Sequence, residues 1–160
     1  MSVPDTLCIL RHEHASLDIL FQRHQEMLVS HAWARAARLL TQYQERLTAH
    51  IRLEEKFLLP YCTDGSGSSP RWGSHVYRTE HRKLEELVRA VTVRLASARR
   101  RGVTPAMLID LLDKERTLKH VAQHHHEREE KGLFIELHER LPLETRMEFS
   151  KELLRVSQCI

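Results

Sequence analysis

The chain has 160 residues, of which 41% are hydrophobic and 29% charged, and its formal net charge is +3. This length fits a single domain spanning residues 1–160, and the composition excludes disordered and fibrous proteins. No apolar run approaches the ~18 residues that a membrane-spanning helix needs, and the first residues lack the features of a secretory signal. We therefore expect a cytoplasmic protein with no membrane partner. Its one unusual count is 12 histidines.

Apolar residues in the first half recur at alternating steps of three and four, which is the spacing of a helical seam. A first helix is predicted from about residue 5 to 29, and its seam includes His14. A second helix is predicted over about residues 33–61, where the seam passes through His50 and Glu54. The following stretch, TDGSGSSPRWGS, is rich in Gly, Ser and Pro and predicts a loop.

The second half shows the same spacing. A third helix is predicted over about residues 74–101, with His81 on its seam. A fourth is predicted over about residues 104–141, where a capping threonine precedes a proline at the first helical position. The seam of this fourth helix includes His125 and Glu129.

Four long helices with short connections predict an all-α fold, an antiparallel up-and-down four-helix bundle with its core over about residues 5–141. A shorter amphipathic piece, about residues 144–156, predicts an extra C-terminal helix. This helix either folds back over the bundle or joins a partner, as in a homodimer.

Two pairs of similar phrases indicate an internal repeat. HIRLEEK at residues 50–56 resembles HHEREEK at residues 125–131. LRHEHASLDIL in the first helix resembles YRTEHRKLEEL in the third, an alignment that matches His14 with His81 and Asp18 with Glu85. The chain is therefore predicted to consist of two similar halves of two helices each.

Counting from the turns predicts that one histidine of each helix lies at the same height. Within each antiparallel pair the two histidines differ by about one residue in their distance from the turn, a mismatch of only ~1.5 to 3 Å. Glu54 and Glu129 lie one helical turn beyond His50 and His125 and point to the same layer. The predicted layer comprises His14, His50, Glu54, His81, His125 and Glu129.

A lone histidine on an apolar face is usually a hydrogen-bonded core residue, but this layer also contains two carboxylates. Burying each carboxylate without a compensating positive charge costs several kcal/mol. Protonated histidines could supply that charge. Neutral imidazoles and carboxylates around a divalent metal would supply it while satisfying every polar group. We therefore predict that these six residues are metal ligands.

The order His14, His50-x-x-x-Glu54, His81, His125-x-x-x-Glu129 on four consecutive helices resembles the hemerythrin family, also called the HHE cation-binding domain. The resemblance implies two non-haem irons, joined by an oxo or hydroxo bridge and by the two carboxylates. Six ligands are also too many for one tetrahedral ion and too few to saturate two octahedral ions. Two ions ~3.5 to 4 Å apart would keep open positions. Manganese and zinc suit the same ligands.

The chain departs from the oxygen-carrying members of that family in two places. Glu85 stands where they have a second histidine on the third helix, and the carboxylate of the fourth helix is Glu129 or Glu130. A residue four places after His125 lies ~40° from it around a helix, and one five places after it lies ~140° away, which favours Glu129. The site is therefore richer in carboxylate than that of the oxygen carriers, and Glu85 could be a further ligand. Such a site favours catalytic turnover over reversible oxygen binding.

These features predict a diiron protein that acts on or senses dioxygen, peroxide or nitric oxide in oxidative or nitrosative stress defence. If it is an enzyme, peroxide removal is the favoured activity. The alternative is an iron-binding or iron-handling module without turnover, and a third class is an interaction bundle that binds no metal. No nucleic-acid partner is expected, because the net charge is small and Arg99–Arg101 fit the negative end of a helix.

Further candidates lie near the layer. His24 and Glu115 are each ten residues from it and could form a second buried polar pair, either a relay or a structural ion pair. Tyr43 fills space on the seam or donates its hydroxyl to a bound oxygen species. A register error of one residue would exchange His126 with His125. The remaining histidine alternatives are His12, which competes with His14, and His120 and His124, which are predicted to be solvated.

The cysteines complete the predictions. Cys8, Cys62 and Cys159 are odd in number and widely spaced, so neither a disulfide framework nor a thiolate zinc cluster is expected. We expect three reduced thiols with structural roles.

Overall fold

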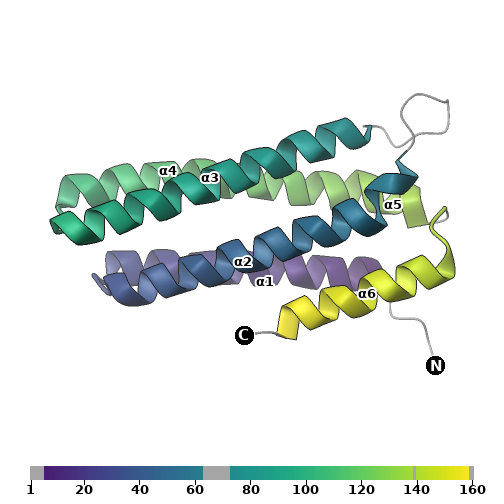
Figure 1. Cartoon of the computed structure of the whole chain (residues 1–160), viewed down its shortest axis with the longest axis horizontal. Helices are drawn as coiled ribbons and strands as arrows, with labels where there is room; N and C mark the ends of the chain where they lie inside the picture. The colour runs from purple at the N-terminus through teal and green to yellow at the C-terminus, as the bar shows by residue number, and fades with distance from the viewer. Residues whose placement is uncertain (1–5, 63–72, 139, 159–160) are drawn as a thin grey trace.

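The computed structural model describes residues 6–62, 73–138 and 140–158, and every regular element within them is a helix (Figure 1). The all-α prediction is therefore confirmed for these residues. Most of the predicted loop, residues 63–72, lies outside the described part, as does Cys159. The elements are α1 (Thr6–Val29), α2 (Trp33–Phe57), the 3-10 turn η1 (Leu59–Tyr61), α3 (Ser74–Arg101), α4 (Pro105–Arg128), the π-helical turn η2 (Glu129–Leu133), α5 (Phe134–His138) and α6 (Leu143–Gln158).

The four long helices lie side by side (Figure 1). α1 packs along α2, α2 along α3 and α3 along α4, and α4 also contacts α1. The connections from α1 to α2 and from α3 to α4 are short and lie at the same end of the molecule, so the chain reverses direction at each of them. At the second connection Gly102 adopts a φ of 83°, a left-handed conformation that favours glycine after a helix. The Thr104 side chain then accepts a hydrogen bond from the Met107 amide and caps α4.

α6 lies against α1 and α2 rather than standing away from the other helices (Figure 1). Its buried Phe149 packs between Phe57 and Phe134, with ring centroids 6.1 and 5.8 Å away. The Ser150 hydroxyl, also buried, donates to the Thr6 hydroxyl of α1 at 3.0 Å. Of the two fates predicted for the C-terminal helix, folding back is the one observed.

The core consists of two apolar clusters that meet at a polar layer. One cluster includes Leu17 of α1, Leu47 of α2 and Leu84 of α3, on the side of the two short connections. The other includes Leu10 of α1 and Tyr77 of α3, together with side chains from α6. α1, α2 and α3 therefore each pass from one apolar cluster to the other through the layer predicted to bind metal, and the chain of α4 does so by continuing into η2. Apolar packing on both sides separates that layer from water along the long axis of the molecule.

The predicted continuous fourth helix is wrong. α4 ends at Arg128, and the chain continues as η2 before α5, which ends at His138. The Phe134 amide donates to the Glu129 carbonyl, five residues before it, so the hydrogen-bonding register widens over this turn. Isolated π-helical turns insert one residue into a helix and often occur at functional sites. This turn begins at a predicted ligand.

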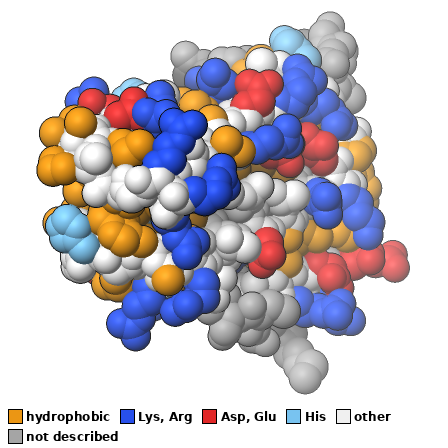
Figure 2. All heavy atoms as spheres, turned by 60° about the vertical axis from the view of Figure 1, so that its left-hand side comes forward, with side chains coloured by type: hydrophobic (Ala, Val, Ile, Leu, Met, Phe, Trp, Pro, Cys, Tyr) orange, Lys and Arg blue, Asp and Glu red, His pale blue; other side chains and the backbone are white. Residues whose placement is uncertain are grey.

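Basic side chains are spread over the face that Figure 2 shows, including the end that carries the two short connections. Arg99, Arg100 and Arg101 form the last turn of α3 and are exposed. Cationic side chains in a last turn stabilise a helix because its carbonyl end carries partial negative charge. None of the helices in the described ranges combines the length and the apolar character that crossing a membrane requires.

The two cysteines within the described residues are not in disulfides, in agreement with the predicted reduced state. Cys8 is exposed on α1, and Cys62 is buried, with its thiol 3.8 Å from the Leu58 carbonyl oxygen.

Candidate metal centre

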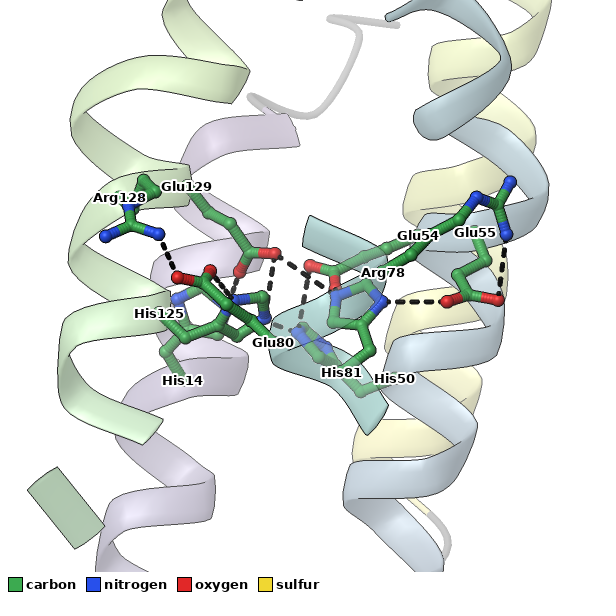
Figure 3. Close-up of polar contacts among 10 residues, drawn as sticks. All are labelled: His14, His50, Glu54, Glu55, Arg78, Glu80, His81, His125, Arg128 and Glu129. Atoms are coloured by element: carbon green, nitrogen blue, oxygen red, sulfur yellow. Dashed lines mark hydrogen bonds and ion pairs between the residues drawn. The ribbon is translucent and has the colours of Figure 1, made fainter. Parts of the chain in front are cut away.

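All six predicted ligands meet in the polar layer, and each is no more than 3% exposed. Their side chains converge from four helices and the first residue of the π-helical turn (Figure 3). His14 and His50 form one side of the layer, with their Nε2 atoms 3.2 Å apart. His81 and His125 form the other side, with ring centroids 4.8 Å apart. The common height predicted for the four histidines is therefore observed.

Glu54 lies between the two pairs of imidazoles. Its Oε1 atom is 3.0 Å from Nε2 of His50, and its Oε2 atom is 3.4 Å from Nε2 of His81. The same carboxylate therefore presents one oxygen to each side of the layer.

Glu129 has the same arrangement from the opposite direction. Its Oε2 atom is 3.4 Å from Nε2 of His14, and its Oε1 atom is 3.0 Å from Nε2 of His125. Oε1 is also 3.8 Å from Nε2 of His81. Each of the two carboxylates thus faces both pairs of imidazoles. This arrangement of donor atoms suits a site for two neighbouring ions.

Most of these converging atoms are close together without being aligned as hydrogen bonds. Both oxygens of Glu54, both oxygens of Glu129 and the Nε2 atoms of His81 and His125 are buried and have no hydrogen-bond partner. Leaving a buried polar atom unsatisfied costs about 1 to 3 kcal/mol. Two donors about 2.1 Å from one octahedral ion and at right angles are about 3.0 Å apart, which is close to the spacings seen here.

The donors divide into two groups of four, and within each group the ligand atoms lie within 4.8 Å of one another. The groups are His14, His50, Glu54, Glu129 and Glu54, His81, His125, Glu129. Because Glu54 and Glu129 belong to both groups, the residues present fit two neighbouring ions with shared carboxylates. Imidazole and carboxylate are ligands that iron, manganese and zinc all accept.

Three of the four imidazoles are oriented by a second carboxylate on their outer nitrogen. The Nδ1 contacts are His14 to Glu130 at 2.7 Å, His81 to Glu55 at 3.0 Å and His125 to Glu80 at 3.0 Å. A carboxylate on Nδ1 holds the proton there and turns the lone pair of Nε2 inward, as is usual for histidines that bind metals.

Each outer carboxylate is paired with an arginine. Arg11 lies 3.3 Å from Glu130, and Arg78 lies 3.3 Å from Glu55. Arg128 pairs with Glu80 (Figure 3). The three arginine–glutamate–histidine chains hold the outer carboxylates in place.

His50 is the exception, because its buried Nδ1 has no hydrogen-bond partner. The internal repeat aligns Glu13 with Glu80, so Glu13 is the expected partner. Glu13 instead accepts from Arg46, at 2.7 Å from Nε, and from the Ser157 hydroxyl of α6. Burial would raise the pKa of Glu13, but these hydrogen bonds lower it below its usual value.

Protons compensate the buried carboxylates in the metal-free protein. Burial opposes a charge on His14, but the carboxylates of Glu129 and Glu130 outweigh it and raise the pKa of this imidazole to about 9. Burial likewise opposes a charge on His81, and Glu129 and Glu54 raise its pKa to about 10. Burial also disfavours the charged forms of Glu54 and Glu129, yet the surrounding histidines keep both pKa values below the ordinary one. Protons and metal ions would therefore compete for the same nitrogens.

The two carboxylates at the start of the π-helical turn have separate positions. Glu129 lies inside the layer against Nε2 of His14, and Glu130 lies outside it against Nδ1 of the same ring. The sequence-based preference for Glu129 over Glu130 as the inner residue agrees with this geometry. His14 is therefore held between consecutive residues, an arrangement compatible with the widened turn that begins at Glu129.

The other candidates are placed as follows. Glu85 is half-buried and belongs to neither group of donors. His12 is exposed, as are His120 and His124, in agreement with the predictions for them. His126, in contrast, is buried beside His14 rather than exchanged with His125.

His24 and Glu115 do form the predicted second buried pair. The His24 Nε2 atom is 2.8 Å from Glu115, and its Nδ1 atom is 2.8 Å from the Ala36 carbonyl oxygen. Gln25 donates to the other oxygen of Glu115 at 3.1 Å. Tyr43 packs against Phe21 with ring centroids 4.9 Å apart, within the apolar cluster near the short connections.

Sequence reasoning missed Glu55 and Glu80 as outer partners of histidines, although the internal repeat contains the signal. The phrase Glu-Glu-Lys occurs in both halves, and its second glutamate, Glu55 or Glu130, contacts a histidine of the following or the first helix. A glutamate also precedes the seam histidine of the first and third helices.

No family model, curated protein or solved structure matches this chain. Its function must therefore be inferred from the geometry of the site.

Proposed function

We propose that this chain is a non-haem diiron protein of the hemerythrin-like type, built as an antiparallel up-and-down four-helix bundle. His14 and His50 would hold one ion, His81 and His125 would hold the other, and the carboxylates would join them. The observation that carries the proposal is that Glu54 and Glu129 each present one oxygen to each pair of imidazoles.

Charge supports two ions rather than none. Two buried carboxylates require compensation, and divalent ions would provide it while also satisfying the buried atoms that lack hydrogen bonds. Four imidazoles and two shared carboxylates leave both ions below six ligands, so small molecules could bind.

Iron held there would supply redox chemistry towards dioxygen, peroxide or nitric oxide. The protein would hold the ligands on rigid helices, orient three imidazoles through Glu55, Glu80 and Glu130, and exclude bulk water with apolar clusters on both sides. The carboxylate-rich donor set favours turnover, and peroxide removal is the activity we favour. A sensor of these molecules in stress defence would use the same site, and a cytoplasmic location stays a prediction.

The second candidate is an iron-handling module without turnover. The observation in its favour is burial, because no ligand of the site is more than 3% exposed and access from solvent is limited. Both candidates require the metal, so metal content cannot distinguish them and a measurement of catalytic turnover can.

The test is hydrogen peroxide consumption by the iron-loaded protein. Many equivalents consumed per chain would support the peroxide-removing enzyme, and consumption of about one equivalent or less would favour iron handling. His50→Ala is the matched variant, because it removes a ligand and should lose most of the bound iron. Wild-type protein that binds no iron under anaerobic loading would contradict both candidates and leave an interaction bundle.

A further inference from the structure

The outward face of α6 carries a stripe of exposed apolar side chains. The helix packs against α1 and α2, so its other side points away from the bundle (Figure 1). Leu143 and Met147 are each 50% exposed, and Leu154 is 36% exposed. At about 100° per residue these three side chains fall within ~40° of one another around the helix, so they form one continuous stripe. We call these three residues the α6 stripe.

A row of charged side chains borders the α6 stripe on one flank. Helical spacing places its four members within ~60° of one another, beside the stripe. All four are exposed and line the same surface hollow as the stripe: Glu144, Glu148, Lys151 and Arg155. The two acidic residues come first along α6 and the two basic residues follow, so the row is negative at one end and positive at the other.

The charges of this row are poorly paired within one chain. The two acidic residues are four positions apart, as are the two basic residues, and like charges at that spacing repel each other. Arg155 pairs with Glu152 at 3.1 Å. No ion pair joins Glu144, Glu148 or Lys151 to another residue in the described part of the chain. The row therefore has charge available for a partner.

A second copy of α6 running in the opposite direction would supply opposite charges. Glu144 and Arg155 are centred on a point between residues 149 and 150, and Glu148 and Lys151 share that centre. A two-fold axis through this point, perpendicular to both helices, would place the acidic half of each row beside the basic half of the other. The axis keeps the flanks on the same side, so each charged row would face its own copy in reverse.

The α6 stripe has nearly the same centre as the charged row. The midpoint of Leu143 and Leu154 lies one residue earlier, a shift of only ~1.5 Å along the helix. Leu143 of one copy would then lie near Leu154 of the other, and the two Met147 side chains would meet close to the axis. A parallel pair would leave the charged rows on opposite sides, so the charges favour the antiparallel arrangement.

We propose that the α6 stripe and its charged row form a two-fold symmetric interface with a second copy of this chain, in which the two α6 helices are antiparallel. This interface does not depend on the diiron site. A contact built on one helix of 16 residues from each copy is smaller than the interface of a permanent dimer. Monomer and dimer should therefore exchange at roughly micromolar concentrations.

The test is sedimentation velocity of the full chain over a dilution series, in the wild type, Glu148→Lys and Lys151→Glu. The wild type should dimerise. Each variant brings like charges together at two symmetry-related places, so its dissociation constant should rise by at least about tenfold. An equimolar mixture of the two variants should recover the dimer, because opposite charges then face each other at both places.

A second pair of variants tests the apolar stripe. Met147→Lys places two like charges close to the axis and should also abolish the dimer. Ile109→Lys, a matched change at a residue of α4 that is 63% exposed, should not. Circular dichroism should show the wild-type helix content in all four variants, since every changed position is exposed.

Three results would overturn the proposal. One is a wild type that stays monomeric at every concentration, and another is a dimer that Met147→Lys leaves intact, which would use a different surface. The third is failure of the mixed Glu148→Lys and Lys151→Glu proteins to recover the dimer, which would exclude the antiparallel pairing. Iron binding is measured separately in each protein, so the diiron proposal stands or falls independently of these results.

Discussion

Loading the metal-free protein should release protons, and the number follows from the site. The carboxylates that surround His14 and His81 raise their pKa values to about 9 and about 10. At pH 7 both imidazoles are therefore almost fully protonated, and a metal can bind their Nε2 atoms only after the protons leave. Filling the site should release at least about two protons per chain at pH 7. At pH 9 the contribution of the two imidazoles should fall to about 1.4 protons.

The same pKa values predict how the stability of the metal-free protein depends on pH. A pKa raised on folding stabilises the folded state fully below the unfolded value of ~6.5, and this contribution is lost as pH rises through the folded value. For His14 the rise to about 9 corresponds to about 3 kcal/mol, lost between about pH 6 and pH 10. Metal affinity should increase over the same range.

Calorimetric titration with Zn²⁺ in two buffers of different ionisation enthalpy measures the proton count. His120→Gln, at an exposed position outside the layer, should leave the count unchanged. Release of less than one proton at pH 7 would refute the reasoning, because it would mean that the buried carboxylates are not compensated by protonated histidines.

Three other variants test separate parts of the structure. Glu80→Ala removes the outer partner of a histidine and should lower metal affinity about 10- to 100-fold in a competition assay, whereas Glu127→Ala on the exposed face of α4 should not. Glu13→Ala leaves the guanidinium of Arg46 buried and unpaired and should lower the free energy of unfolding in urea by about 3 to 5 kcal/mol. Glu85→Ala should retain two metal ions per chain by elemental analysis, because Glu85 belongs to neither group of donors.

Each of these variants has an outcome that contradicts its premise. Equal affinities of Glu80→Ala and Glu127→Ala would show that the outer carboxylate does not orient its imidazole. If Glu13→Ala lowered the free energy of unfolding by no more than about 1 kcal/mol, the Glu13–Arg46 pair would contribute no more than a solvent-exposed ion pair does. Loss of one ion in Glu85→Ala would make that glutamate a ligand.

Helical periodicity predicted the layer well because the face on which a residue lies depends only on its spacing from its neighbours in the same helix. His14 and His50 fall on the same seam as the apolar residues of their helices, so burying the seam necessarily buries them. Similar distances from the short connections then bring the four histidines to one height, since each residue adds a constant rise of about 1.5 Å.

The π-helical turn was not predictable in the same way. A pattern that assumes about 100° per residue cannot show where one residue is inserted, and nothing in the letters Glu-Glu-Lys-Gly-Leu breaks a helix strongly. The prediction of one continuous α-helix over about residues 104–141 was wrong for this reason. Glu129 was still assigned to the interior correctly, because the turn begins at that residue rather than before it.

The contacts between helices were also beyond the sequence pattern. Glu13 and Glu80 occupy equivalent positions in the repeat, yet Arg46 and Ser157 bind the first and His125 binds the second. The side chain that binds each glutamate belongs to another helix. The spacing of apolar residues within one helix carries no information about the side chains of its neighbours. The position of His126 was not predictable for a related reason, since burial of two consecutive histidines requires neighbours on both sides of α4.

Anomalous diffraction from crystals of the iron-loaded protein, recorded at the iron edge, tests the paired site most directly. Two peaks about 3.5 to 4 Å apart should appear, both within bonding distance of Glu54 and Glu129, with His14 and His50 beside one and His81 and His125 beside the other. A single peak, or iron bound only outside this layer, would contradict the account.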